Sequence, residues 1–396
     1  MKKTLIAFAA LSAIAGMAQA QSTVTIYGIV DAHIASVKTN VAAAAATTIQ
    51  NPTQSKIDSG GLNGSRWGIR VSEDLGAGLA AIGNLESGFD ISTGVSQQGG
   101  ALFGRRANVG LTSTSFGTVT LGRNSSSYDD VSADHTMMGA SMFDPTNNNV
   151  GPSPTAASTI LGSAANASVF LGNHANIAIV PQFTWVGFNT RFNNSVKYIS
   201  PNFSGFSGSA MYAFGEDKTT AQNASKTVSA NLKYANGPLL VSGGYQSEGA
   251  AVNQITGAKP ALENTLLSVA YDFGVAKVGA GFNRAKFKDV IIPAGLPGAN
   301  GSSTFAAQRE YSLSVSVPLG ATTLSAAYGH SKGDTLGKSD GFGVQAVYSL
   351  SKRTSLYAGA ASTKAFSNVV TAANTAFPGS NIGKTTTYAT GIRHTF

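Results

Sequence analysis

Apolar residues recur at every second position along most of the chain, and this alternation limits what the chain can fold into. In residues 23–37, Val24 and Ile26 share one parity, whereas Asp31 and His33 take the other. Successive side chains of a β-strand point to opposite faces, so such a segment has one apolar and one polar face. Beyond the N-terminal region, no apolar run reaches the ~20 residues that a membrane-spanning helix requires.

Two kinds of connection separate the alternating segments. Seven are tight turns that mostly carry the Gly, Asn or Pro that such turns need: residues 75–78, 114–117, 201–205, 235–238, 272–274, 318–320 and 349–353. Eight are long and polar or rich in Ala and Gly: residues 38–62, 90–102, 125–190, 215–226, 247–262, 287–307, 331–340 and 364–385. Turns and loops alternate strictly, as in outer-membrane β-barrels. Seven hairpins plus a first and a last strand predict an all-β, sixteen-stranded antiparallel barrel.

Composition favours a barrel in a membrane over a soluble β-sandwich. Charged residues make up only 12% of the chain, about half the share that is usual in soluble proteins. An outward apolar band would be a large exposed patch in water, whereas in a bilayer it faces lipid. Strands can cross hydrocarbon only as a closed barrel, because every main-chain N–H and C=O must be paired internally.

The N-terminal segment has the pattern of a secretory signal peptide. Lys2 and Lys3 precede an apolar stretch at residues 5–17, and Ala18-Gln19-Ala20 follows as a cleavage site. We therefore expect residues 1–20 to be removed and residues 21–396 to form the barrel. Loss of the two lysines lowers the formal charge from +8 to +6. Export argues against nucleic acid as a partner, and the absence of cysteine excludes disulfides and thiolate metal sites.

Several stretches resemble a known family. They are residues 24–31 (VTIYGIVD), 65–76 (SRWGIRVSEDLG), 103–111 (FGRRANVGL), 116–123 (FGTVTLGR), 196–203 (VKYISPNF), 348–354 (YSLSKRT) and 391–396 (GIRHTF). In this order they are similar to the trimeric general porins of Gram-negative bacteria, especially the β-proteobacterial branch. The resemblance covers essentially the whole mature chain.

The resemblance implies a location, a function and a set of partners. The chain would lie in the outer membrane, in contact with lipid and lipopolysaccharide, as a homotrimer. Its water-filled channel would pass ions and small hydrophilic solutes by passive diffusion, without enzymatic activity or a cofactor. The third loop, residues 125–190, would fold into the lumen and form the narrowest point.

That loop is by far the longest connection, and loops beyond ~15 residues are usually functional or disordered. Its Ala-rich part, residues 155–171, is expected to include a short helix. Carboxylates gather near its start, at Asp129, Asp130, Asp134 and Asp144. We expect the first three of these to form the acidic side of the constriction.

Arginines are expected on the opposite wall. Arg66 and Arg70 take the parity opposite to Trp67 and Ile69, so both should face the lumen. For the third arginine of this wall, strand parity and the family match favour different residues. Parity favours Arg106, and the family match favours Arg105.

Three further charged residues complete the predicted set. Arg191 matches another constriction arginine of the family. Glu86, on the inward parity, matches a carboxylate of the wall. Arg123 shares the outward parity and is assigned to a loop or subunit contact instead. The excess of arginine, together with the positive mature charge, predicts a moderate preference for anions.

The alternatives to a general pore are a barrel enzyme, a channel specific for sugars or phosphate, and a plugged adhesin. A barrel enzyme would need His beside Ser or paired carboxylates, but the five histidines (His33, His135, His174, His330 and His394) are scattered, and Asp31 with His33 is interpreted as a solvated pair. A sugar channel would need inward aromatics, of which Tyr27 is one of few. A phosphate channel would need several lysines, and Lys286 and Lys288 are too few. A plugged adhesin would not conduct ions.

Overall fold

The computed structural model consists of β-strands and their connections. It describes residues 22–41, 53–139, 141–147, 149–150, 184–220, 222–249, 252–253, 261–288, 307–334, 336–367 and 382–396. Within these ranges no helix is long and apolar enough to cross a membrane. The expected signal peptide and the helix at 155–171 lie outside the described residues.

Twenty-one strands occur in these ranges. They are β1 (Thr23–Val41), β2 (Thr53–Ser59), β3 (Arg66–Gly76), β4 (Leu79–Gly88), β5 (Arg106–Ser113), β6 (Gly117–Ser125), β7 (Asn149–Val150), β8 (Phe188–Asn189), β9 (Arg191–Ile199), β10 (Phe206–Phe214), β11 (Gln222–Asn223), β12 (Lys226–Asn236), β13 (Leu239–Gly249), β14 (Val252–Asn253), β15 (Ala261–Asp272), β16 (Lys277–Lys288), β17 (Gln308–Leu319), β18 (Thr322–Gly333), β19 (Gly337–Ser349), β20 (Thr354–Lys364) and β21 (Ile382–Thr395).

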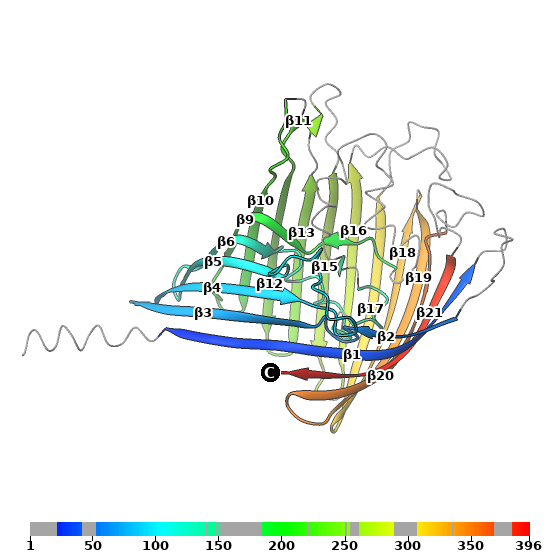
Figure 1. Cartoon of the computed structure of the whole chain (residues 1–396). Helices are drawn as coiled ribbons and strands as arrows, with labels where there is room; N and C mark the ends of the chain where they lie inside the picture. The colour runs from blue at the N-terminus through cyan, green and yellow to red at the C-terminus, as the bar shows by residue number, and fades with distance from the viewer. Residues whose placement is uncertain are drawn as a thin grey trace, which may run out of the picture.

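The long strands form one closed antiparallel ring in chain order (Figure 1). The ring closes where β21 pairs with β1. The paired residues run from Ile29 opposite Thr395 to Val41 opposite Ile382. Main-chain hydrogen bonds in both directions between Gly28 and Phe396, each 3.1 Å long, extend this seam. Sixteen places make up the ring, so the predicted sixteen-stranded barrel is confirmed. The small pairs β7–β8 and β11–β14 stand apart from it.

One place in the ring is shared by two strands. β1 pairs through residues 23–29 with β3, and through residues 32–38 with β2. β2 and β3 are thus two halves of one wall strand, separated by residues 60–65. The prediction of a loop across residues 38–62 is therefore wrong for 53–59, and β1 also extends four residues beyond the expected end at Val37.

A bulge at residues 60–65 is held by the carboxylate of Asp31. This carboxylate accepts hydrogen bonds from the main-chain N–H groups of Gly61 (3.0 Å), Leu62 (2.9 Å) and Asn63 (2.8 Å), and another from the Tyr357 hydroxyl. Asp31 is completely buried. The predicted solvated pair with His33 is therefore wrong, because the bulge takes the place of water around the carboxylate.

The predicted turns agree with the structure, and a second predicted loop is shorter than expected. All seven predicted tight turns join consecutive strands of the ring. The connection expected at residues 331–340 is reduced to residues 334–336, because β18 continues to Gly333 and β19 starts at Gly337. The polar residues at these strand ends resemble a loop in the sequence, although their main chains are paired between β18 and β19.

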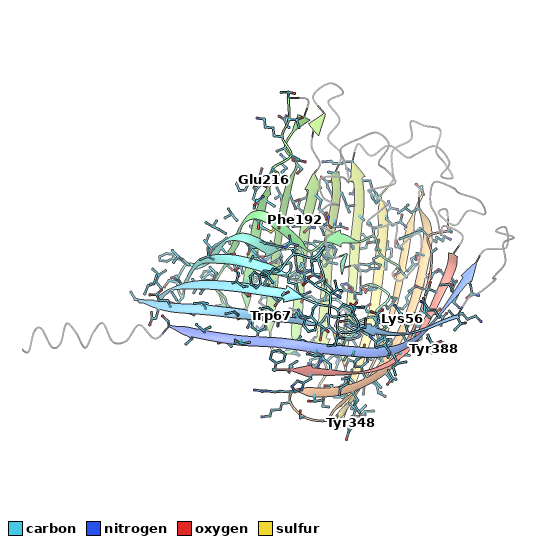
Figure 2. The ribbon with its side chains drawn as sticks, in the orientation of Figure 1. Lys56, Trp67, Phe192, Glu216, Tyr348 and Tyr388 are labelled. Carbon is cyan, nitrogen blue, oxygen red and sulfur yellow. The ribbon has the colours of Figure 1, made fainter. Side chains whose placement is uncertain are left out.

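Side-chain parity is also confirmed. Val24 and Ile26 are 66% and 67% exposed, whereas Asp31 and Ser65 lie inside and are fully buried. Tyr348 and Tyr388 extend from the outer surface (Figure 2). The exposed apolar residues therefore form the outer face of the barrel, and small polar residues line the inner face.

Candidate functional site

The connection between β6 and β9 contacts strands far round the ring. The Tyr128 hydroxyl donates to Asn283 Oδ1 of β16 (2.9 Å), and the Ser141 hydroxyl donates to Gln345 Oε1 of β19 (2.6 Å). Both acceptors lie on the inner face. Residues 126–147 are therefore bonded to strands that are remote from β6 and β9 in the sheet order.

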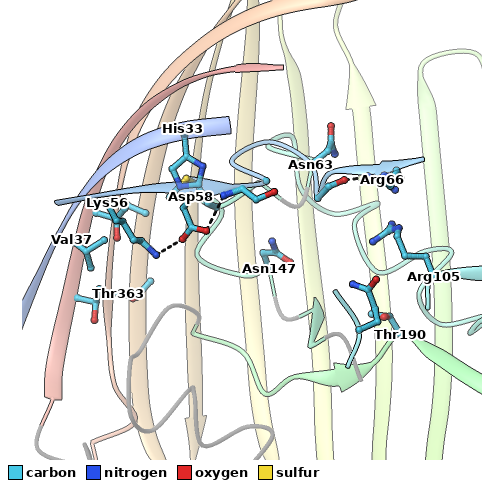
Figure 3. Close-up of a pocket in the computed structure, with 18 of the residues that line it drawn as sticks. His33, Val37, Lys56, Asp58, Asn63, Arg66, Arg105, Asn147, Thr190 and Thr363 are labelled. Carbon is cyan, nitrogen blue, oxygen red and sulfur yellow. Dashed lines mark hydrogen bonds and ion pairs between the residues drawn. The ribbon is translucent and has the colours of Figure 1, made fainter. Parts of the chain in front are cut away.

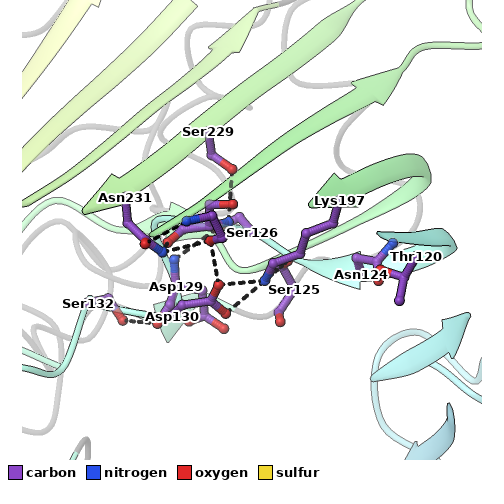
Figure 4. Close-up of polar contacts among 12 residues, drawn as sticks. Thr120, Asn124, Ser125, Ser126, Asp129, Asp130, Ser132, Lys197, Ser229 and Asn231 are labelled. Atoms are coloured by element: carbon purple, nitrogen blue, oxygen red, sulfur yellow. Dashed lines mark hydrogen bonds and ion pairs between the residues drawn. The ribbon is translucent and has the colours of Figure 1, made fainter. Parts of the chain in front are cut away.

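Two of the predicted acidic residues bind this connection to the wall strands through ion pairs. Asp130 forms an ion pair with Lys197 of β9 (2.6 Å) and accepts from the Ser209 hydroxyl of β10 (3.0 Å), as Figure 4 shows. Asp134 forms an ion pair with Lys233 of β12 (2.9 Å). Their charges are compensated locally by lysines that the sequence analysis had not considered.

The returning part of the connection is held by two buried carboxylates. Glu310 of β17 accepts from the main-chain N–H of Val186. Glu248 of β13 accepts from Asn189 through the main-chain N–H (2.9 Å) and the side-chain amide (2.6 Å). Neither glutamate was predicted. Each glutamate occupies an inward position of a strand whose neighbouring inward residues are mainly small or polar. A charged side chain at such a position is the sequence signal that could have identified it.

Aromatic packing supports the same segment. Tyr128 and Phe188 meet edge to face with centroids 4.6 Å apart, and His135 stacks on Trp185 at 4.6 Å. Leu266 of β15 joins this buried cluster. These apolar contacts join the connection to the wall strands.

A cavity of about 710 Å³ lies beside this connection (Figure 3). We call it the basic cavity, because its lining includes five cations, namely Lys56, Arg66, Arg105, Arg106 and Arg191, against two carboxylates, Asp58 and Asp129. The remaining lining is mainly small polar residues.

Both candidates for the third arginine line the basic cavity. Arg106 is the first residue of β5 and stands opposite Glu86, an inward residue of β4. Arg105 precedes the strand, so strand parity does not apply to it, and its Nε donates to Glu86 Oε1 (2.6 Å). The Tyr27 hydroxyl also donates to Glu86 (2.8 Å). Glu86 thus orients Arg105 at the edge of the cavity.

Arg66 and Arg191 have no carboxylate partner in the described ranges. Arg66 Nε donates to the main-chain oxygen of Gly64 (3.1 Å), and an Nη of Arg191 donates to the Thr190 hydroxyl (2.9 Å). Neither acceptor carries a charge, so these hydrogen bonds do not offset the guanidinium charge. Both arginines therefore contribute positive charge to the basic cavity.

Arg70 and Arg123 lie outside the lining. The Arg70 guanidinium sits 4.0 Å from the centroid of the Tyr27 ring, in a cation–π contact. Arg123 donates to the Gly104 main-chain oxygen (2.7 Å) and to Asn193 Oδ1 (2.6 Å). The structure therefore places Arg70 away from the cavity, unlike the other predicted arginines, and gives Arg123 the loop contact expected of it.

The first connection adds charged groups that sequence reasoning missed. Lys56 and Asp58 of β2 form an ion pair of 2.5 Å and line the cavity together with His33 of β1. They had been assigned to a loop. Recognition of residues 53–59 as a strand would have placed both on its inward face, since they alternate with the outward Ile57.

Comparison with known proteins gives the chain a family. The model of a family described as Gram-negative porin matches residues 7–365. The chain belongs to the Gram-negative porin family. This porin is 33% identical to an outer membrane porin protein of Bordetella pertussis, with all of both chains covered. It is 31% identical to outer membrane porin protein 32 of Delftia acidovorans, over 90% of this chain and 88% of that one.

Solved structures agree. The anion-selective porin from Comamonas acidovorans superposes with a TM-score of 0.69 and 26% identity, covering 95% of this chain and all of that one. The protein is therefore a general diffusion porin of the Gram-negative outer membrane. The predicted family, function and location are confirmed.

Proposed function

We propose that this porin passes small hydrophilic solutes through the basic cavity and prefers anions. The observation that carries the proposal is the excess of five cations over two carboxylates in the lining. The similarity to a structure described as an anion-selective porin supports it. A narrow passage between low-dielectric walls screens these charges less than an open surface does, so the excess acts on ions in transit.

We further propose that residues 125–190 form the constriction. Support comes from the hydrogen bonds of residues 126–147 and 184–189 to inner-face residues round the ring. Asp129 of this connection lines the same cavity as Arg66 and Arg105 of the wall. Facing charges of opposite sign would create a transverse field, in which polar solutes align and from which apolar solutes are excluded.

Reversal potential tests the anion preference. The purified porin, reconstituted in a planar bilayer under a KCl gradient, should give a potential of the sign set by chloride. Arginine keeps its charge at any working pH, so the sign should hold between pH 6 and 9. A potential of the sign set by potassium contradicts the proposal.

A pH dependence follows from Asp129, which lies in the connection and outside the strands. Burial raises the pKa of Asp129 above its ordinary value, against the opposing effect of Arg191. On acidification this carboxylate is neutralised early, and the cavity loses a negative charge. Anion preference should therefore rise as the pH falls, on the order of two- to fivefold for one charge.

The measurement is the permeability ratio against pH, made in a His33→Gln background because His33 lines the same cavity. In that background, Asp129→Asn should remove the step and hold the ratio at its acid value. A step of unchanged size in Asp129→Asn would rule out this assignment.

The other functions have less support. Ser312 and His135 are hydrogen bonded at 2.8 Å, but both are buried and no carboxylate in the described part bonds to the imidazole. The residues that line the basic cavity include no Phe, Tyr or Trp side chain, which a sugar-binding channel would need. We therefore propose a channel without catalytic activity or cofactor, which acts as a homotrimer after removal of residues 1–20.

A further inference from the structure

The methionines beyond residue 20 all lie inside the barrel. There are four of them: Met137, Met138 and Met142 in the connection between β6 and β9, and Met211 on the inner face of β10. The apolar outer face of the ring has none, and the chain has no cysteine. The sulfur atoms that an oxidant could attack are therefore confined to the lumen.

Of these four methionines, only Met142 lines the basic cavity. Its side chain is partly exposed, whereas Met138 and Met211 are only 3% and 2% exposed. Met137 is also partly exposed, but its terminal methyl group lies against β16, where a Cβ on Gly279 would come within 2.9 Å of it. Solvent access favours the oxidation of a thioether. A small oxidant in the cavity therefore reaches Met142 first.

Met142 also joins three parts of the molecule. Its main-chain N–H donates to the Gly61 oxygen of the bulge (2.8 Å). Its side chain packs against a buried cluster that includes Ala35 of β1, Leu62 of the bulge and Phe143 of the connection. Oxidation to the sulfoxide turns this apolar side chain into a polar one. A buried sulfoxide oxygen without a hydrogen-bond donor is unfavourable, so we expect the oxidised side chain to leave the cluster and extend into the cavity.

The charge of the cavity determines which oxidant is enriched there. Val37, which packs against the same cluster as Met142, lies with Lys56 at one end of the cavity, and Arg66 and Arg105 lie at the other end (Figure 3). Charges between low-dielectric walls raise the local concentration of mobile ions of the opposite sign. An anionic oxidant is therefore enriched in the cavity relative to a neutral oxidant of similar size.

We propose that Met142 is the site at which anionic peroxy acids oxidise this porin and thereby lower its conductance. The thioether sulfur attacks the outer peroxide oxygen, so that an S–O bond forms and the O–O bond breaks. The electron pair of the O–O bond leaves with the anion of the parent acid, which also takes up the peroxide proton. The sulfur is oxidised to the sulfoxide, the peroxide is reduced, and no other reactant is consumed.

Two parts of this proposal have different foundations. The exposure of the Met142 side chain to the cavity is a matter of geometry alone. The preference for an anionic oxidant rests on the proposed anion preference of the channel. Methionine sulfoxide reductases convert the sulfoxide back to the thioether, so the change is reversible.

Two oxidants that differ in charge test the site. The purified, folded porin is treated with peroxymonosulfate, which is an anion, or with neutral hydrogen peroxide. Site-resolved mass spectrometry measures the rate of sulfoxide formation at each methionine, and planar-bilayer recording measures the single-channel current. With both oxidants, Met142 should react about tenfold or more faster than the buried Met138 and Met211. The current should fall in step with the conversion of Met142.

Three variants separate the site from its surroundings. Met142→Leu conserves the volume of the side chain and should keep its current after treatment. Met137→Leu is the matched control and should lose current as the unchanged porin does. In Arg66→Gln/Arg191→Gln, the rate of oxidation at Met142 should fall with peroxymonosulfate and stay the same with hydrogen peroxide, because only the anion is attracted by the cavity.

Equal rates at Met142 and Met138, or an equal loss of current in Met142→Leu, overturn the site. An unchanged rate with peroxymonosulfate in Arg66→Gln/Arg191→Gln overturns the choice of an anionic oxidant. The reversal potential of the same variant under a KCl gradient then shows whether the anion preference of the channel fails as well.

Discussion

Replacement of Arg66, Arg105 and Arg191 together by glutamine is expected to abolish the anion preference of this porin. All three line the basic cavity, and two of them have only neutral hydrogen-bond acceptors in the described ranges. Loss of three charges leaves Lys56 and Arg106 against Asp58 and Asp129. We expect the chloride-to-potassium permeability ratio to fall on the order of tenfold, since each such charge contributes roughly 0.5 kcal/mol at about 8 Å in water and about 1.4 kcal/mol corresponds to a factor of ten.

Arg70→Gln is the matched control for this experiment. Arg70 lies on the same inward face of β3 as Arg66, but it stacks on Tyr27 outside the lining. Its loss should change the ratio much less than Arg66→Gln does alone. If Arg70→Gln has the larger effect, or if the triple variant keeps its preference for chloride, the basic cavity is not the selective point.

Asp31→Ala is expected to be strongly destabilising. It removes the acceptor of three main-chain N–H groups and of the Tyr357 hydroxyl, all in a buried setting. Buried donors left without a partner cost about 1–3 kcal/mol each, with partial relief by local movement. We expect the free energy of unfolding to fall by about 3–5 kcal/mol. The midpoint of urea unfolding in lipid vesicles measures this loss.

Two comparisons separate this effect from a general defect. Tyr357→Phe removes one of the four donors and should cost about 1 kcal/mol. Asp31→Ala should also change the single-channel current, because the bulge contributes Asn63 and Gly64 to the cavity lining and Gly61 accepts from the main-chain N–H of Met142 (2.8 Å). Stability and current that are both unchanged would show that Asp31 does not hold the bulge.

Local patterns were sufficient to predict the ring. The alternation of Val24 and Ile26 with Asp31 depends only on the geometry of an extended chain, and the turns depend only on the few residues that form them. Parity also placed Arg66 inward. It favoured Arg106 and missed that Arg105 also lines the cavity, because Arg105 precedes β5 and the start of β5 is set by hydrogen bonding to β4.

Contacts between distant segments could not be predicted in the same way. Asp130 forms an ion pair with Lys197, which lies 67 positions away in the sequence, and nothing near either residue predicts this pairing. Parity and its small polar neighbours single out Glu310 as an inward carboxylate, but its role depends on the approach of Val186 from the far end of a long connection. Such pairings follow from the closed ring and not from the neighbouring sequence.

The seam between β1 and β21 has a consequence for assembly. The two strands that are farthest apart in the chain pair with each other, so every shorter stretch of this sheet keeps two unpaired edges. An open edge offers its N–H and C=O groups to any other strand, including that of a second copy. During insertion into the membrane, both edges of the sheet must therefore be protected until β21 pairs with β1. Variants that weaken β21 should accumulate as aggregates rather than as leaky channels.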